Sequence, residues 1–309
     1  MYTTRDATVA VLLSTYNGED FLEDQLNSLL RQTYPHVEVV IRDDGSADHT
    51  GMILRQYAKS SNTRVVYGDN IGVVRSFFSL INLMPADTPY VAFCDQDDVW
   101  DDDKIERAVR CLAQYKPDEP AMYCGALRVV DEQLEYIRSS RTNVTPTFAN
   151  ALVQNIATGC TVLINNAALR LIANKSIEWS NIGMHDWWIY QVVAAFGKVK
   201  FDPDPAVNYR QHENNVIGSA FGVDLWKRRI ERRLSGAPNI LLRQTMEFLS
   251  VYGPEVPREK YILASEFLTQ AGGNSVFRRA MYACKTPVYR QSHIDDIVMR
   301  VLIGIGQLR

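Results

Sequence analysis

The chain has few cysteines, and they are not arranged to form disulfides or a structural zinc site. Its 309 residues include five cysteines, an odd number with no C-x-x-C pair. This pattern is typical of a reducing compartment. The five histidines are scattered, without the H-E-x-x-H pattern of zinc proteases. No run of about 18 apolar residues is present, so the sequence predicts no transmembrane helix. A basic-then-apolar leader is also missing, so we expect no secretory signal.

Two common phosphate-binding motifs are missing as well. Neither G-x-G-x-x-G nor G-x-x-x-x-G-K-[ST] occurs, which counts against a dinucleotide-dependent dehydrogenase and a P-loop NTPase. No stripe of Lys and Arg interleaved with aromatic residues runs through residues 1–220. We therefore expect no nucleic acid partner for this part of the chain.

The formal net charge of −3 conceals an asymmetry between two parts of the chain. Residues 221–309 hold 14 Lys and Arg against 8 Asp and Glu, a net charge of +6. The other 220 residues hold 19 against 28, a net charge of −9. The sequence thus joins an acidic body to a basic tail.

Apolar runs of strand length alternate with helical patterns in the first part of the chain. The runs expected to form strands are Val9–Leu13, Val37–Ile41, Arg64–Tyr67 and Tyr90–Cys94. Such strands are apolar on both faces, and their alternation with helices predicts an α/β domain. Its central sheet should be mostly parallel, with helices on both sides.

The later part of the chain is more mixed. Met122–Val130 and Thr158–Ile164 are expected strands, and His185–Phe196 is an expected helix. From Asp224 onward only helical patterns occur. We therefore expect a C-terminal helical appendage.

Polar turns follow the first four expected strands. They are Ser14–Gly18, Asp43–Ser46, Asp69–Gly72 and Asp95–Asp98. In parallel sheets the carboxyl ends of the strands share one edge, and ligands bind beyond that edge. The four turns are therefore predicted to form one binding site.

An acidic cluster is the sharpest local signal. Asp95, Asp97 and Asp98 place three carboxylates within four residues. They repel one another unless a cation lies between them, and carboxylate oxygens favour Mg²⁺ or Mn²⁺. The alternative is an acidic helix N-terminus. Asp43–Ser46 also has two interpretations: a capped turn, or a carboxylate that accepts a hydrogen bond from a base or ribose.

Several motifs occur together in a fixed order. They are Val9–Gly18, Gln32–Tyr34, Arg42–Ser46, Asn70–Gly72, Asp95–Asp98, Thr158–Thr161, Met184–Trp188 and Tyr209–Gly218. In order and spacing they resemble family 2 glycosyltransferases of the GT-A fold. Their combination resembles the rhamnosyltransferase-like branch that builds bacterial cell-wall and O-antigen polysaccharide. The resemblance implies a Rossmann-like central sheet and spans roughly residues 8–220.

The resemblance implies a nucleotide-sugar site at the strand ends. The matching residues are Ser14, Thr15, Tyr16, Asp43, Asp44, Asn70, Gly72, Arg75, Asp95 and Asp97. Asp44 matches the carboxylate that contacts the base. Asn70 and Gly72 match a loop that closes over the nucleotide.

The resemblance also implies a divalent metal and a catalytic base. Asp95, Asp97, Asp98 and His212 are the implied ligands of Mg²⁺ or Mn²⁺, which would neutralise charge on the leaving diphosphate. An alternative role for His212 is contact with the diphosphate. Asp186 matches the base that takes the proton from the acceptor hydroxyl in an inverting displacement. Taken alone, Asp186 would instead be a helix N-cap.

Four further residues are expected to contact the sugar or the acceptor. They are His185, Trp187, Trp188 and Arg210. The two tryptophans could stack on a sugar ring, and buried packing is the alternative for them. His185 is the second acid–base candidate.

The resemblance suggests a boundary between a catalytic domain at residues 1–222 and a helical region at residues 223–309. Within the tail, Lys227–Arg233 carries six charges in seven residues. It is interpreted either as a solvated helix face or as a segment attracted to an anionic membrane surface. The apolar segment Ile297–Leu308 could pack on the body or form a contact between copies in a homo-oligomer. We expect a cytoplasmic protein, with peripheral contact to the inner face of the membrane under the second interpretation.

The sequence therefore predicts an inverting, metal-dependent glycosyltransferase. The resemblance makes dTDP-rhamnose the expected donor and a cell-surface or lipid-linked glycan the acceptor. One alternative is a hexosyltransferase that uses a UDP-sugar. A nucleotidyltransferase would carry a glycine-rich basic loop near the N-terminus, which is absent. A catalytically silent sugar- or nucleotide-binding module would lack the acidic cluster or Asp186, and both are present.

Overall fold

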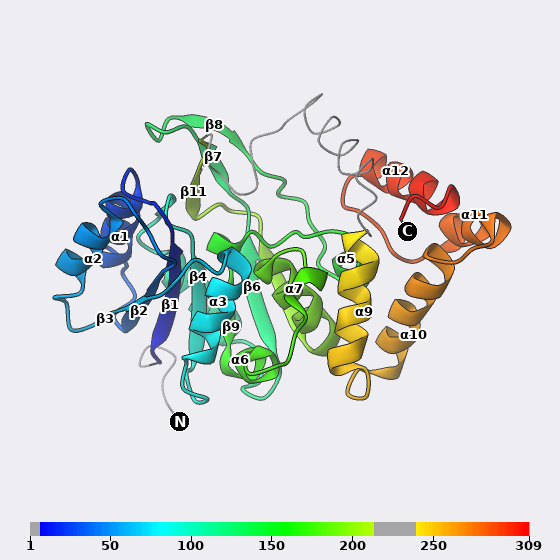
Figure 1. The fold of residues 1–309 in the computed structure, drawn as a ribbon, viewed down its shortest axis with the longest axis horizontal. Coiled ribbons are helices and arrows are strands. Elements are labelled where there is room, and N and C mark those ends of the chain that lie inside the picture. The colour runs from blue at the N-terminus through cyan, green and yellow to red at the C-terminus, as the bar shows by residue number, and fades with distance from the viewer. Residues whose placement is uncertain (1–6, 213–238, 309) are drawn as a thin grey trace.

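A seven-stranded sheet forms the centre of the molecule (Figure 1). The computed structural model describes residues 7–212 and 239–308. In spatial order the strands are β10 (Lys198–Asp202), β6 (Ala121–Gly125), β9 (Leu163–Asn165), β4 (Tyr90–Cys94), β1 (Val9–Thr15), β2 (Val37–Asp43) and β3 (Thr63–Tyr67). Neighbouring strands are parallel, except that β9 runs antiparallel to both β4 and β6. This confirms the mostly parallel sheet expected from the sequence.

Helices cover both faces of this sheet. They are α1 (Leu22–Leu30), α2 (Thr50–Tyr57), α3 (Val73–Asn82), α4 (Lys104–Leu112), α5 (Phe148–Ala151), α6 (Asn166–Ile172) and α7 (His185–Phe196). Side chains alternate across β1, so that Val11 and Leu13 join a core with α1, α2 and α4. Leu12 points the other way, into a core with α3, α6 and α7. The central strands β1, β4 and β6 are mostly apolar because both of their faces are buried.

A smaller four-stranded sheet lies beside the carboxyl end of β4. Its strands, in spatial order, are β5 (Val99–Trp100), β11 (Val207–Arg210), β7 (Arg128–Val130) and β8 (Tyr136–Ser139). The single strand expected over Met122–Val130 is wrong, because the chain passes from β6 in the large sheet to β7 in the small one. The strand expected over Thr158–Ile164 is wrong in its first half, where Gly159–Thr161 forms a 3₁₀ turn before β9. The first break lies within buried, mostly apolar sequence, so polarity did not reveal it.

The C-terminal region is helical, as expected. Its described helices are α9 (Ile240–Tyr252), α10 (Arg258–Glu266), a π-helical turn (Phe267–Ala271), α11 (Val276–Lys285) and α12 (His293–Gly304). Phe248 and Tyr252 of α9 share a core with Trp188 of α7, so this region extends the core of the body. The expected domain boundary and the basic segment 227–233 lie outside the described residues. Within the described residues, no helix is long and apolar enough to span a bilayer.

Candidate functional site

The carboxyl ends of β1 and β4 are tied together by one side chain. Gln96, just after β4, accepts hydrogen bonds at Oε1 from the Thr15 hydroxyl (2.7 Å) and from the Tyr16 backbone N–H (2.8 Å). The hydroxyls of Ser14 and Ser76 are hydrogen-bonded to each other at 2.6 Å, which joins β1 to α3. Thr15 is buried, whereas Tyr16 is 47% exposed. Tyr16 therefore offers its ring to whatever lies beyond this edge.

Asp44 links the end of β2 to the loop that precedes α3. Its carboxylate pairs with the Arg42 guanidinium at 2.8 Å, and both side chains are buried. It also accepts the backbone N–H groups of Ile71 (3.1 Å) and Gly72 (2.9 Å). Gly72 has a φ of +82°, a conformation that favours glycine. Asp44 therefore fixes the loop that carries the predicted nucleotide contacts.

Of the other predicted nucleotide contacts at this edge, Asp43 is buried in a turn, whereas Asn70, Gly72 and Arg75 are exposed. Asp43 accepts hydrogen bonds from the Ser46 hydroxyl (2.6 Å) and the Ser46 N–H (3.0 Å), so it stabilises its own turn. Asn70, Gly72 and Arg75 are exposed on the loop and on the first turn of α3. These three are accessible to a ligand, and their nucleotide contacts stay predictions.

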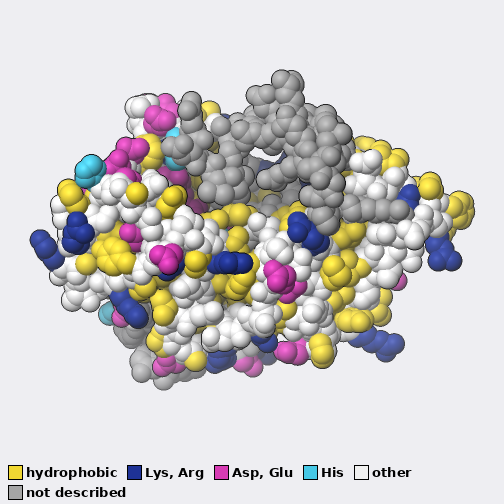
Figure 2. Space-filling view, in the orientation of Figure 1, with side chains coloured by type: hydrophobic (Ala, Val, Ile, Leu, Met, Phe, Trp, Pro, Cys, Tyr) yellow, Lys and Arg dark blue, Asp and Glu magenta, His cyan; other side chains and the backbone are white. Residues whose placement is uncertain are grey.

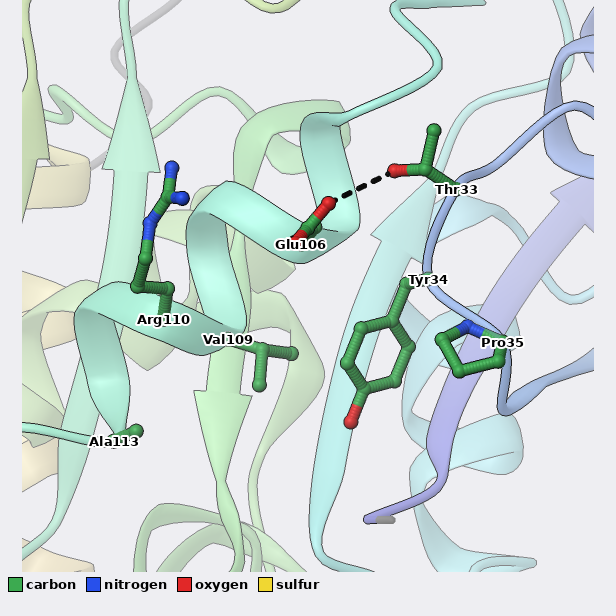
Figure 3. Close-up of a pocket in the computed structure, with 7 residues that line it drawn as sticks. All are labelled: Thr33, Tyr34, Pro35, Glu106, Val109, Arg110 and Ala113. Atoms are coloured by element: carbon green, nitrogen blue, oxygen red, sulfur yellow. Dashed lines mark hydrogen bonds between the residues drawn. The ribbon is translucent and has the colours of Figure 1, made fainter. Parts of the chain in front are cut away.

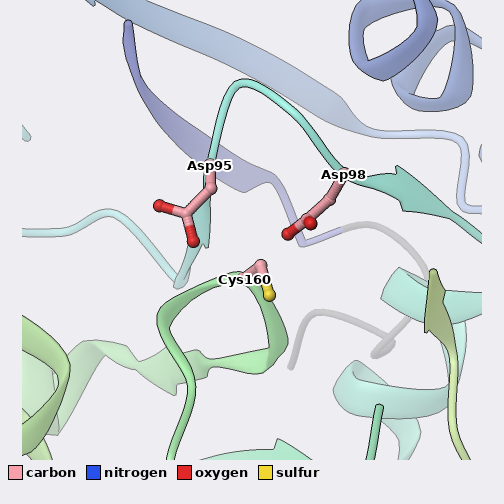
Figure 4. Close-up of side chains that lie close together, drawn as sticks. All are labelled: Asp95, Asp98 and Cys160. Atoms are coloured by element: carbon pink, nitrogen blue, oxygen red, sulfur yellow. The ribbon is translucent and has the colours of Figure 1, made fainter. Parts of the chain in front are cut away.

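The acidic cluster is concentrated between β4 and the 3₁₀ turn at Cys160. The side chains of Asp95, Asp98 and Cys160 point toward one another (Figure 4), and their ligand atoms lie within 4.8 Å. Burial, followed by the charges of Asp97 and Asp186, raises the pKa of Asp95 to about 8. Burial likewise raises the pKa of Asp98 well above its usual value. Like charges are thus held close together here, which a cation would relieve.

Asp98 is the most enclosed member of the cluster. Its side chain has no exposed surface. One carboxylate oxygen accepts the Arg210 backbone N–H at 3.1 Å, which ties the cluster to β11. The Asp98 carboxylate also lies within 4.8 Å of the Cys160 Sγ.

His212 lies beside Asp97. Its Nε2 lies 2.8 Å from Oδ2 of Asp97. The imidazole also packs against the Phe21 ring, with 4.9 Å between ring centroids. The predicted metal ligands Asp97 and His212 are therefore in direct contact.

Lys104 is a buried cation that sequence reasoning missed. Its side chain is 1% exposed, and its Nζ lies 3.1 Å from the centroid of the Trp100 ring. Burial lowers its pKa to about 7, while the nearby Asp98 and Asp95 charges oppose that shift. One signal could have revealed it, because Lys104 lies on the buried stripe of α4 with Ala108 and Leu112, at spacings of four residues.

Asp186 lies in the first turn of α7, beside Gly159 in the 3₁₀ turn that carries Cys160. Its Oδ1 accepts the Trp187 N–H at 2.6 Å. Burial raises its pKa to about 6, and hydrogen bonds from Trp187, Asn155 and Gly159 oppose that shift. Because its charge also raises the pKa of Asp95, the two carboxyls belong to one site.

The four expected sugar or acceptor contacts separate into buried and accessible residues. His185 is buried and stacks on Phe77 with 3.9 Å between centroids, and burial lowers its pKa to about 3. Trp188 is also buried, with no exposed surface. Trp187 is half-buried and donates its Nε1–H to the Ala151 carbonyl at 2.8 Å. We therefore correct the assignments of His185 and Trp188, which pack in the core, whereas the role of Trp187 stays a prediction.

Arg210 needs the same correction. It is 2% exposed, and it donates hydrogen bonds to the Asp97 carbonyl (2.9 Å) and to the Asp24 carboxylate (2.8 Å). Its guanidinium also lies over the Phe21 ring at 4.5 Å. Arg210 thus joins α1, β11 and the acidic turn instead of contacting a sugar.

A separate cavity lies between the α1–β2 loop and α4 (Figure 3). It measures about 550 Å³ and is lined by Thr33, Tyr34, Pro35, Glu106, Val109, Arg110 and Ala113. Across it, the Thr33 hydroxyl donates to the Glu106 carboxylate at 3.1 Å. No predicted site residue lines this cavity.

Comparison with known proteins shows which protein family the sequence matches. The family model described as glycosyl transferase family 2 matches residues 10–173. The dTDP-rhamnosyl transferase RfbG of Shigella flexneri is 29% identical over 226 residues, which cover 67% of this chain and 74% of the relative.

Solved structures share the fold. S. aureus TarS 1–349 in complex with UDP-GlcNAc matches with a TM-score of 0.61 at 15% identity, over 98% of this chain and 82% of that one. The mannosyltransferase PcManGT from Pyrobaculum calidifontis, in complex with GDP-Man and Mn²⁺, matches with a TM-score of 0.56 at 18% identity. That match covers 97% of this chain and 85% of the other. These likenesses confirm the expected GT-A fold.

Proposed function

Because the chain belongs to glycosyl transferase family 2 and is a glycosyltransferase, we propose that it transfers L-rhamnose from dTDP-rhamnose to a glycan hydroxyl with inversion. The observation that carries the reaction type is the placement of Asp186. It is a buried carboxyl beside the 3₁₀ turn that carries Cys160, and its charge contributes to the raised pKa of Asp95. In an inverting displacement the base must lie opposite the leaving diphosphate, and Asp186 would take that position.

Asp186 acts as the base in this proposal. Its pKa of about 6 leaves it mostly ionised at neutral pH, yet basic enough to accept a proton. The acceptor oxygen forms a bond to the anomeric carbon as the bond from that carbon to the diphosphate oxygen breaks. The proton of the acceptor hydroxyl moves to the Asp186 carboxylate. The N–H of Trp187 orients that carboxylate through its hydrogen bond.

The acidic strand end fits a divalent cation, Mg²⁺ or Mn²⁺. Asp97 and His212 are in contact, and Asp95 lies close enough to Asp97 for the Asp97 charge to raise its pKa. Carboxylate oxygens and an imidazole nitrogen suit Mn²⁺, and carboxylates with substrate phosphates suit Mg²⁺. Asp95, Asp97, Asp98 and His212 would hold the ion, since Asp97 contacts His212 and ligand atoms of Asp95 and Asp98 lie within 4.8 Å of each other. When bound, the ion would neutralise charge on the departing diphosphate.

The donor is the finer part of the proposal. The relative named dTDP-rhamnosyl transferase supports dTDP-rhamnose. The alternative is a UDP-sugar, since a structural neighbour binds UDP-GlcNAc. Ser14 and Tyr16 would contact the nucleotide at the edge of the sheet, and Thr15 and Asp44 would position the strand end and the loop that surround it.

We further place the protein in the cytoplasm, at the inner face of the membrane. The acceptor there would be a cell-surface polysaccharide precursor or a lipid-linked saccharide. The thiols support a reducing compartment, because all five cysteines are free.

Donor hydrolysis across a panel of nucleotide-sugars tests this proposal. The chain is incubated with Mg²⁺ or Mn²⁺ and dTDP-rhamnose, UDP-glucose, UDP-GlcNAc or GDP-mannose, and the released nucleotide diphosphate is measured. We expect dTDP release to be fastest, and EDTA to suppress it. Faster release of UDP would support the alternative donor. If EDTA does not slow the release of nucleotide diphosphate, the proposed metal dependence is wrong. If none of the nucleotide-sugars is hydrolysed, the proposed donor class is wrong.

A further inference from the structure

Helices α11 and α12 expose more large apolar side chains than a solvated surface requires. Phe277 and Ile294 are 76% and 75% exposed. The exposed apolar residues of the two helices are Val276, Phe277, Met281, Ile294, Ile297, Val301 and Ile305. Single exposed apolar residues are ordinary, but a group of them marks an interaction surface.

These side chains form one face, which we call the hairpin face. On α12, Ile294, Ile297, Val301 and Ile305 recur at spacings of three and four residues, so they line one side of the helix. The opposite side of α12 packs inward through Met299 and Ile303.

The exposed stripe of α11 continues this face. Phe277 and Met281 lie four residues apart on α11 and flank Ala280. The two helices meet where a Cβ added to Gly304 would lie 3.9 Å from the Ala280 Cα. Figure 2 shows apolar side chains at the end of the molecule where Figure 1 places α11 and α12.

The charges on these two helices are uneven. Arg278 and Lys285 of α11 are exposed. The acidic side chains are partly covered, and Asp296 is engaged by the Arg300 guanidinium (2.8 Å) and by the Arg290 N–H (2.9 Å). Among the described residues 276–308, the fully exposed charged side chains are therefore cationic. The sequence continues this bias, since residues 221–309 carry a net charge of +6.

We infer that the hairpin face rests on an anionic lipid bilayer, with α11 and α12 lying in the plane of its surface. Apolar residues on one side of a helix, flanked by cations, are the combination that binds such interfaces. Packing against a second copy through this face would add that copy's Arg278 and Lys285 to the same interface, whereas anionic lipid neutralises these cations. The inference deepens the proposed function, since a lipid-linked acceptor lies at the same surface.

The test uses the full chain and vesicles of phosphatidylcholine with or without phosphatidylglycerol. We expect co-sedimentation with the anionic vesicles at low salt, and weaker binding at high salt or without phosphatidylglycerol. The exposed thiol of Cys284 provides a position for a polarity-sensitive fluorophore, once Cys111→Ser removes the half-buried thiol. Its emission should shift to the blue with anionic vesicles. The same label at Met52→Cys on α2, in a Cys284→Ser background, should not shift.

Matched variants separate this face from other sources of binding. Phe277→Ser with Ile297→Ser should weaken vesicle binding by about tenfold per residue. Arg278→Gln with Lys285→Gln should weaken it by roughly fivefold per charge, on anionic vesicles only. The control pair, Leu30→Ser with Met52→Ser, removes side chains that are 58% and 53% exposed elsewhere, and it should leave binding unchanged.

Three results would overturn the inference. They are no vesicle binding by the unaltered chain at low salt, unchanged binding by Phe277→Ser with Ile297→Ser, and a stable dimer that this pair dissociates. Donor hydrolysis in solution is measured for every variant and should match that of the unaltered chain, which also shows that the variants are folded. If the unaltered chain does not hydrolyse any donor but still binds anionic vesicles, the proposed function is wrong and the membrane inference stands.

Discussion

His212 Nε2 lies 2.8 Å from the Asp97 carboxylate, although the two residues are 115 positions apart. The small sheet brings them together. Trp100 and Val99 of β5 pair antiparallel with Val207 and Asn208 of β11. Residues that precede β5 therefore lie beside residues that follow β11, and the acidic turn gains an imidazole.

This contact predicts that His212→Ala weakens metal binding. Loss of an outer-shell partner costs about 10–100-fold in metal affinity, so loss of a direct ligand should cost at least about tenfold. Mn²⁺ affinity is measured by electron paramagnetic resonance on the chain without donor. His49→Ala, which removes an exposed histidine, is the control. Equal Mn²⁺ affinity in the two variants would remove His212 from the metal shell.

Asp186→Asn is expected to stop transfer but keep donor binding. The amide cannot take the acceptor proton, and loss of a general base costs about 10²–10⁴-fold in rate. Transfer rate and donor dissociation constant are measured separately. Asp118→Asn, at an exposed loop position, should change neither. Normal transfer by Asp186→Asn would show that another group is the base.

The same substitution should change how stability depends on pH. Burial raises the folded-state pKa of Asp186 from 3.8 to about 6, so the folded chain binds more protons than the unfolded chain between these values. Its ionisation therefore destabilises the fold as pH rises through that window, by about 2–3 kcal/mol in total.

In Asp186→Asn the side chain cannot ionise, so the variant does not lose this stability as the pH rises. Its free energy of unfolding, relative to the unaltered chain, should be higher at pH 8 than at pH 4. Urea denaturation with EDTA at both pH values measures the difference. A relative stability that stays constant between the two pH values would mean that the carboxyl is not desolvated.

Arg42→Met should destabilise the fold and weaken donor binding. It leaves the Asp44 carboxylate buried without its partner at 2.8 Å, which costs about 3–5 kcal/mol. Arg31→Met breaks an exposed pair with Asp102 and should cost under about 1 kcal/mol. Denaturant unfolding measures both, and Asp44→Asn added to Arg42→Met should recover part of the loss. If Arg42→Met costs no more than Arg31→Met, the buried pair does not hold the loop.

The strands and helices that carry the predicted nucleotide contacts could be predicted from the sequence, because buried segments appear there as apolar runs between polar residues. β1, β4 and most of β2 are buried on both faces, so each appears as an apolar run that ends at polar residues. The helix expected over His185–Phe196 has the same bounds as α7. The split of the expected strand Met122–Val130 between two sheets left no such trace, since the residues on both sides of the break are buried.

Aromatic and charged residues were harder to place. Trp187 and Trp188 are adjacent and identical in type, yet Trp188 has no exposed surface and Trp187 is half-buried. Arg210 resembles a ligand contact in sequence, but in the fold it is enclosed against Phe21, Asp24 and Asp97. The spacing of apolar residues predicts which face of a helix is buried. It does not predict how much of each side chain on that face a neighbouring helix or strand covers.

The sequence by itself determined the family, the α/β class and the row of polar strand ends, because these depend on short-range order and on motif spacing. Only the tertiary structure decided which of those polar groups meet. Asp97 contacts His212 through the pairing of β5 with β11, and the packing of α7 on the sheet brings Asp186 beside the 3₁₀ turn that carries Cys160. Such contacts join residues far apart in the chain, and their geometry depends on how the whole core packs.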